Sequence, residues 1–146
     1  MKVKEIMTPT PVSTGPDVKL DFVATLMVDN NCGEIPICEG GKVLGVVTDR
    51  DIACRSFAVG RKNPLDVTAR EIMTRNVYTI APDAEVATAL QMMEENRVRR
   101  LPVVDNGKLI GMVSVADLAS HIDEKRAGQL VTAVSRPVVE AAVPAP

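Results

Sequence analysis

Two short segments of the chain place a hydroxyl and a carboxylate three residues apart, where a β-prone run gives way to a helix. They lie at residues 45–51 and 111–117, and each begins with a glycine. A helix N-terminus offers unpaired N–H groups and a positive dipole, which suit a phosphate. The two oxygens of an Asp carboxylate match the adjacent hydroxyls of a ribose. The candidate ligand-binding residues are therefore Thr48, Asp51, Ser114 and Asp117.

A purely structural explanation fits the same four residues. In a capping box, the hydroxyl accepts a hydrogen bond from the backbone N–H three residues later, and the acid accepts one from the N–H of the hydroxyl residue. Short cap patterns of this kind are common. At the level of sequence both interpretations, ligand binding and helix capping, stay open.

The two segments belong to an internal repeat with an offset of 66 residues. Glu5-Ile6-Met7-Thr8 matches Glu71-Ile72-Met73-Thr74, and residues 5–54 match residues 71–120 at 15 positions without a gap. Chance would give about three matches from ordinary amino-acid usage. Two copies of this length are too few and too long for a solenoid, so we expect two small α/β units.

Each copy is predicted to contain a strand, a helix, two strands joined by a hairpin, and a second helix. In the second copy Asp83 lies where an N-cap is expected, before an apolar face with helical spacing. The proline in the second strand indicates a strand end or an edge. The elements expected in the first copy are Val12–Thr14, Val18–Asp29, Glu34–Cys38, Lys42–Val47 and a helix from Asp49; those in the second are Val77–Ile80, a helix bearing Val86, Ala89, Leu90 and Met93, then Leu101–Val104, Leu109–Val113 and Val115–His121.

These elements give a mixed α/β fold made of two β-α-β-β-α repeats. We place the first repeat at residues 1–58, a linker at 59–68 and the second repeat at 69–124. Residues 125–146 are rich in Ala, Val and Pro, and we expect at most a frayed helix followed by a mobile tail.

Composition argues against several classes of protein. A chain of 146 residues buries roughly 68% of its unfolded surface, so it needs no disulfides. Its 17 basic and 19 acidic residues give no broad positive field for nucleic acid. Phe22, Phe57 and Tyr78 are too few to form a stacking platform for single strands. We see no secretory signal and no run of apolar residues long enough to span a membrane.

The reactive side chains indicate neither a metal site nor an enzyme. Cys32, Cys38 and Cys54 do not form a CxxC pair, and His121 is the single histidine. We expect three buried or half-buried thiols in a reducing cytoplasm. Catalysis is the weakest hypothesis because no nucleophile lies beside a base in the pattern.

The chain resembles a tandem pair of cystathionine beta-synthase (CBS) domains over about residues 3–122. The residues that carry the resemblance are the two Ile-Met-Thr openings, the two Pro-Asp helix starts, Ile35-Pro36-Ile37, Leu101-Pro102-Val103-Val104 and the two Gly-x-x-Thr/Ser-x-x-Asp ends. The resemblance implies two copies related by a pseudo-twofold axis, with clefts between them that bind AMP, ADP, ATP or S-adenosylmethionine. It also implies pairing of two chains into a flat four-domain disc.

Carried over to this sequence, the family pattern assigns a role to each matching position. Asp51 and Asp117 would bind ribose hydroxyls, and Thr48 and Ser114 would lie beside ribose or phosphate. The first strands and the segments around the two prolines would hold adenine through backbone groups and apolar contacts. This second set comprises Val12, Thr14, Ile35, Pro36, Tyr78, Ile80, Leu101 and Pro102.

The two copies differ where the family often carries basic residues for a phosphate. The second copy has Arg99 and Arg100 before its proline, whereas the first has Gly33 and Glu34. The clefts are therefore expected to be unequal. The arginines also have a structural explanation, as solvated charge beside a strand or as partners of nearby acids.

The leading hypothesis is a cytoplasmic regulatory module that senses an adenosyl ligand, requires no cofactor, and acts on an unidentified protein partner or through its own homodimer. The alternative is a structural or interaction module of the same fold whose sites stay empty.

Overall fold

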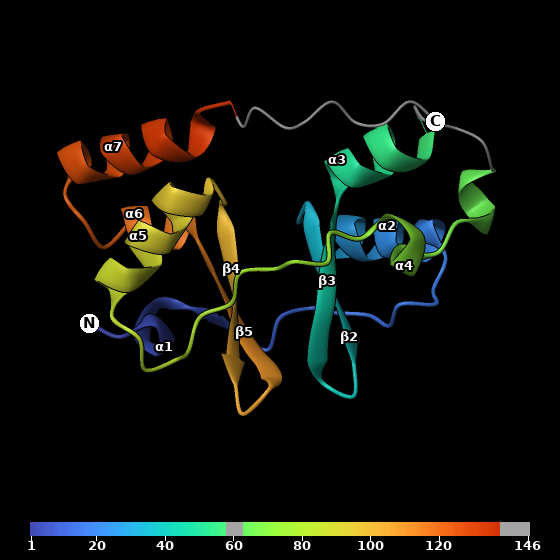
Figure 1. The fold of residues 1–146 in the computed structure, drawn as a ribbon, viewed down its shortest axis with the longest axis horizontal. Helices are drawn as coiled ribbons and strands as arrows, with labels where there is room; N and C mark the ends of the chain where they lie inside the picture. The colour runs from blue at the N-terminus through green and yellow to red at the C-terminus, as the bar shows by residue number, and fades with distance from the viewer. Residues whose placement is uncertain (58–62, 138–146) are drawn as a thin grey trace. The chain divides into compact units, whose positions relative to one another are not determined.

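The computed structural model describes residues 1–57 and 63–137, and it confirms a mixed fold of helices and short sheets (Figure 1). The chain forms two compact units. Among the described residues, unit 1 contains 1–10, 78–105 and 110–137, and unit 2 contains 11–57, 63–77 and 106–109. Residues 58–62 of the expected linker and residues 138–146 of the expected tail lie outside the described residues.

Unit 1 packs helices against a three-stranded sheet in the order β1-β5-β4. Strand β1 is antiparallel to β5, with Thr8 opposite Met112. The buried core includes Leu101, Val113 and Leu118, none of which is exposed. Its elements are α1 (Val3–Ile6), β1 (Thr8–Pro9), α5 (Val86–Asn96), β4 (Arg100–Asp105), β5 (Lys108–Ser114), α6 (Val115–Ala119) and α7 (Glu124–Ser135).

Unit 2 is built around an antiparallel hairpin with a bulge between Ile37 and Cys38. Its core joins Leu20 and Val23 of the long helix to Ile35 of the hairpin. Its elements are α2 (Leu20–Asp29), β2 (Glu34–Glu39), β3 (Lys42–Thr48), α3 (Asp49–Asp51), the π-helix η1 (Ile52–Phe57), the 3-10 helix η2 (Pro64–Asp66) and α4 (Ala69–Ile72).

The strands expected at the start of each repeat are much shorter than predicted. Each consists of one parallel bridge, from Thr14 to Ile37 and from Ile80 to Val103. Thr14 donates its N–H to Pro36 at 3.2 Å, and Ile80 donates to Pro102 at 3.0 Å. The prolines direct their carbonyl groups toward these bridges, so their missing N–H groups do not interrupt the hairpins.

The opening segment of each repeat is packed into the unit formed by the other repeat. Val3 and Ile6 of α1 belong to the core of unit 1, whereas Ala69 and Ile72 of α4 belong to the core of unit 2. The backbone hydrogen bonds that hold them are the same at the 66-residue offset. They run from Val3 N to Ala84 O (2.9 Å), Lys4 N to Pro82 O (3.0 Å) and Val86 N to Met1 O (3.0 Å), and from Ala69 N to Val18 O (2.9 Å), Arg70 N to Pro16 O (2.8 Å) and Leu20 N to Val67 O (3.0 Å).

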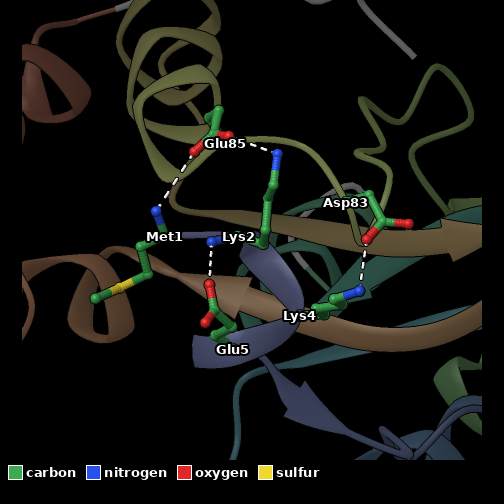
Figure 2. Close-up of polar contacts among 6 residues, drawn as sticks. All are labelled: Met1, Lys2, Lys4, Glu5, Asp83 and Glu85. Carbon is green, nitrogen blue, oxygen red and sulfur yellow. Dashed lines mark hydrogen bonds and ion pairs between the residues drawn. The ribbon is translucent and has the colours of Figure 1, made fainter.

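Ion pairs reinforce the seat of α1 on the start of α5 (Figure 2). Lys4 Nζ lies 2.6 Å from Asp83 Oδ1, and Lys2 pairs with Glu85. The hydrogen bond from Lys4 lowers the pKa of Asp83. The expectation that Asp83 caps this helix is wrong, because the N-cap residue is Glu85. The carbonyl groups of Pro82 and Ala84 accept hydrogen bonds from α1, so this turn is not part of the helix, which begins at Val86.

A well-formed helix occupies the first half of the region in which we expected at most a frayed helix followed by a mobile tail. Helix α7 runs from Glu124 to Ser135 and buries Leu130 and Val134 in the core of unit 1. Asp123 caps it by accepting a hydrogen bond from Arg126 N at 2.8 Å. The expectation of at most a frayed helix is thus wrong for residues 125–135, since burial of Leu130 and Val134 stabilises the helix.

Two glycines mark where the opening segments approach the hairpins. A Cβ atom on Gly45 would lie 2.5 Å from the carbonyl oxygen of Thr74, a backbone obstacle. On Gly111 it would collide mainly with the flexible side chain of Met7. The first clash is therefore the harder to relieve.

We expect Gly45→Ala to lower the free energy of unfolding by about 1–3 kcal/mol, because overpacking displaces backbone. Gly111→Ala should cost less, since Met7 can move. Gly15, with no atom within 4 Å of its added Cβ, provides the control. Urea denaturation measures all three variants. Equal midpoints for Gly45→Ala and Gly15→Ala would contradict the close approach.

Leu130→Ala should destabilise the protein by about 2–5 kcal/mol, since it leaves a cavity under α7. Val131→Ala, at a neighbouring position that is 46% exposed, should change stability by no more than about 0.5 kcal/mol. Thermal unfolding compares the two. If both variants melt with the wild type, α7 does not contribute to the core.

Candidate functional site

The first candidate pair lies where β3 ends and α3 begins. Thr48 is extended, and its Oγ1 accepts a hydrogen bond from Asp51 N at 3.0 Å. In return, Thr48 N donates to Asp51 Oδ2 at 2.9 Å. Asp49 N donates to Gly33 O at 2.9 Å, which ties this turn to the chain just before β2. We call Thr48–Asp51 the first capping turn.

The second candidate pair repeats this geometry between β5 and α6. Ser114 N donates to Asp117 Oδ2 at 2.8 Å, and Asp117 N donates to Ser114 Oγ at 3.2 Å. The serine hydroxyl also donates to Oδ2, at 2.8 Å. Val115 N donates to Arg99 O at 3.0 Å, so Arg99 lies beside this turn. We call Ser114–Asp117 the second capping turn.

The capping-box interpretation is confirmed at both turns, but the caps engage only one oxygen of each carboxylate. Asp51 Oδ1 lies 3.5 Å from Arg55 Nε, and the Asp51 side chain is 13% exposed. Asp117 is half-buried, and its Oδ1 has no hydrogen-bond or ion-pair partner among the described residues. An acceptor oxygen is thus left over at the second turn.

The residues expected to hold adenine divide into core residues and more accessible ones. Ile35, Ile80 and Leu101 are in the cores, at 0%, 5% and 0% exposure, so their side chains serve packing. The backbone groups of Thr14 and Ile80 are already bonded to the two proline segments. Pro36 and Pro102 are buried, Val12 and Thr14 are half-buried, and Tyr78 is 47% exposed.

The arginines expected to meet phosphate lie near the second capping turn, and one of them holds α7. Arg99 Nη2 donates to Ser135 Oγ at 3.0 Å, and Arg97 donates to Pro137 O. Arg100 is exposed at the first position of β4. Sequence reasoning missed the role of Arg99 because it missed α7.

A second ion pair fastens α7 to α5. Arg126 binds both carboxylate oxygens of Glu94, with Nη2 to Oε2 at 3.1 Å. Its hydrogen bond lowers the pKa of Glu94. A depressed carboxyl pKa contributes stability above the unfolded value of 4.5, which is lost as the pH falls through the folded value.

The thiols differ from expectation at one position. Cys32 and Cys38 are half-buried, whereas Cys54 is exposed. Burial raises the pKa of Cys38. Over residues 1–57 and 63–137, no three His, Cys, Asp or Glu side chains are grouped to hold a metal ion. Within the same ranges, no helix has the length and apolar character needed to cross a membrane.

Sequence reasoning also missed Arg55. It lies four residues after Asp51, the spacing at which side chains meet on a helix. Its guanidinium contacts Asp51, and Nη1 donates to Ile72 O at 3.2 Å. The spacing alone could have indicated the first of these contacts.

Comparison with known proteins finds one family. The sequence profile of the CBS domain matches residues 3–56 and 69–124. The CBS domain-containing protein YhcV of Bacillus subtilis is 36% identical over 134 residues, which cover 91% of this chain and 94% of that protein. Hypoxic response protein 1 of Mycobacterium tuberculosis is 33% identical over 136 residues, covering 92% and 94%.

Solved structures agree with these matches. A crystal structure of Hypoxic Response Protein I with two coordinated zinc ions has a TM-score of 0.77 and 32% identity, covering 84% of this chain and 100% of that one. The CBS domain pair of protein MJ0100, in complex with 5′-methylthioadenosine and S-adenosylmethionine, has a TM-score of 0.72 and 28% identity, covering 83% and 94%.

Removal of the first cap tests its energetic role. Thr48→Ala should lower the free energy of unfolding by about 0.5–2 kcal/mol, because the N–H of Asp51 loses its acceptor. Thr48→Ser keeps the hydroxyl and should retain most of that stability. Chemical denaturation separates the two variants. Equal losses for both would show that the methyl group, and not the cap, stabilises the turn.

Proposed function

This chain belongs to the CBS domain family and carries two such domains in tandem, and from that premise we propose that it is a regulatory module that binds an adenosyl compound. One observation carries the proposal above the others. The second capping turn leaves Asp117 Oδ1 without a partner among the described residues, beside a helix N-terminus. The similarity to a domain pair that holds 5′-methylthioadenosine and S-adenosylmethionine supports the adenosyl class.

In this proposal Asp117 accepts a hydrogen bond from a ribose hydroxyl through Oδ1, while Oδ2 keeps its place in the cap. The cap then serves the ligand, because it fixes the rotamer of the carboxylate before binding. A preformed acceptor loses less conformational entropy on binding than a free side chain. Asp51 would bind a second ribose in the same way, although its Oδ1 already faces Arg55.

In each unit, an adenine would lie against that unit's own short parallel bridge and proline segment. Val12, Thr14 and Tyr78 retain exposed surface there, and the buried Ile35, Ile80 and Leu101 support it from beneath. Pro36 and Pro102 would contribute through backbone groups and apolar contact.

The identity of the 5′ group depends on the arginines. A phosphate of AMP, ADP or ATP would compete with Ser135 for Arg99 and would also attract Arg100. S-adenosylmethionine brings a positive sulfonium instead and gains nothing from these residues. A ligand panel therefore reads out whether the arginines act on the ligand or on α7.

The output is proposed to pass to a protein partner or through a homodimer in the cytoplasm, without catalysis by this chain. No cofactor is required for binding of this kind. The ligand would act by shifting the protein between states of different affinity for that partner.

A ligand-free interaction module is the second candidate. It is favoured by the first capping turn, where both oxygens of Asp51 already have partners within the protein. Native mass spectrometry of freshly purified protein distinguishes the candidates, because a retained nucleotide or nucleoside adds its mass to the folded species.

We expect at least one of AMP, ATP, S-adenosylmethionine and 5′-methylthioadenosine to raise the melting temperature. A ligand at 100 times its dissociation constant adds about 2.7 kcal/mol of stability. Asp117→Asn should weaken binding by about 1.5–3 kcal/mol, since it removes the charge from the acceptor. Calorimetric titration measures the loss.

Asp105→Asn provides the matched control. The substitution removes the same charge as Asp117→Asn, and Asp105 is exposed at the end of β4. It should leave affinity unchanged. No thermal shift with any of the four compounds at millimolar concentration, together with no retained ligand in the mass spectrum, would reject the adenosyl proposal in favour of the interaction module.

A further inference from the structure

The two capping turns differ in the residue that follows each aspartate by four positions. This residue is Arg55 after Asp51 and His121 after Asp117, at the same 66-residue offset. The two turns share the same cap and the same backbone bond, which runs to the residue just before β2 or β4. This position is the one at which a side chain contacts the aspartate carboxylate in one turn and not in the other.

Arg55 joins two parts of unit 2. Its Nε lies 3.5 Å from Asp51 Oδ1, and its Nη1 donates to Ile72 O at 3.2 Å. Ile72 is the last residue of α4, so its carbonyl is one of those that a helix leaves without an internal partner. A basic side chain at this end satisfies the carbonyl and favours the helix dipole. The guanidinium of Arg55 thus contacts both the candidate carboxylate of Asp51 and α4, the opening helix of the second repeat.

His121 makes neither of these contacts. Its Nδ1 lies 2.8 Å from the backbone oxygen of Asp117 and 3.0 Å from Ser120 Oγ. In unit 1, α6 ends at Ala119 and the chain then leads to Asp123, which caps α7. In unit 2, the helical winding continues after α3 as η1, through Phe57. Among residues 1–57 and 63–137, the carboxylate of Asp117 therefore has no basic partner, and α1 has no counterpart of the link that Arg55 gives α4.

We propose that Arg55 is a positioning residue of the first capping turn, which competes with a ribose hydroxyl for Asp51 Oδ1 and connects occupancy of that oxygen to the end of α4. This inference rests on the proposed function and assigns a regulatory difference within it. The first turn binds more weakly and reports binding to the exchanged segment. The second turn binds more tightly and has no such link.

The binding test uses 5′-methylthioadenosine, which has the ribose hydroxyls but no phosphate to attract a guanidinium. Asp117→Asn supplies the background, so that the first turn is read alone. In that background Arg55→Met should tighten binding about three- to fivefold, the effect expected for loss of one partly exposed ion pair. Lys42→Met is the matched control, because Lys42 lies at the start of β3, outside the capping turn, is exposed and forms no ion pair with another described residue. It should leave the affinity unchanged.

The structural test follows the amide of Met73, which donates to Ala69 O at 2.9 Å and closes α4. Its hydrogen exchange, measured by NMR without ligand, should be several-fold faster in Arg55→Met than in Lys42→Met. In the Asp117→Asn background, 5′-methylthioadenosine should accelerate this exchange when Arg55 is present. It should have no effect on the exchange when Arg55 is replaced by Met.

Three results would overturn the inference. If Arg55→Met changes neither affinity nor exchange while the ligand binds normally, Arg55 has no positioning role and the proposed function survives. If Arg55→Met weakens binding of AMP but not of 5′-methylthioadenosine, Arg55 is a phosphate ligand instead. If the wild-type protein binds none of these compounds, the inference and the proposed function fail together.

Discussion

The exchange of opening segments between the two repeats is the constraint on which the rest of the structure depends. Three backbone hydrogen bonds seat α1 on the start of α5, and three equivalent bonds seat α4 on the start of α2. Val3 and Ile6 complete the core of unit 1, and Ala69 and Ile72 complete the core of unit 2. Neither repeat contains a whole core in its own sequence. The 66-residue offset is therefore also a rule of assembly, because each Ile-Met-Thr opening has to meet the hairpin of the other copy.

The candidate site depends on the same strands that receive these segments. Strand β3 carries Gly45, where Thr74 approaches too closely for a side chain, and ends three residues later at the Thr48 cap. Strand β5 carries Gly111 and ends at the Ser114 cap in the same way. The pattern of a glycine, two apolar residues and a hydroxyl residue therefore describes one structural unit. The glycine allows the opening segment of the other repeat to approach, and the hydroxyl caps the helix that follows. The spacing that suggested ligand chemistry is thus also required by the fold, and of the four carboxylate oxygens only Asp117 Oδ1 has no partner among the described residues.

Local patterns predicted what local forces determine. The hairpin strands are found within one residue of their expected ends, and the two capping boxes have the expected partners. The exchange could not be predicted, because an apolar face shows that a helix is buried but not against which repeat. The first strands were overestimated because β-propensity is local, whereas a strand needs a partner along its length. Helix α7 was missed although Ala127, Leu130 and Val134 have helical spacing after the Asp123 cap, because composition was given more weight than periodicity.

The contacts that sequence reasoning missed have one feature in common. Equivalent backbone positions of the two repeats carry side chains of different charge, which have different partners. Arg99 donates to Ser135 of α7, whereas the equivalent position of the first repeat is Gly33, which has no side chain to donate. Arg55 and His121 occupy equivalent positions, yet one contacts a carboxylate and the other a backbone carbonyl. The two repeats have similar backbone geometry because equivalent hydrogen bonds and core packing stabilise that geometry in each copy. Side chains outside the shared caps are not selected in this way, and their partners depend on the residues that follow in the chain. For this reason the two aspartates share a position and a cap, but they do not share an electrostatic environment.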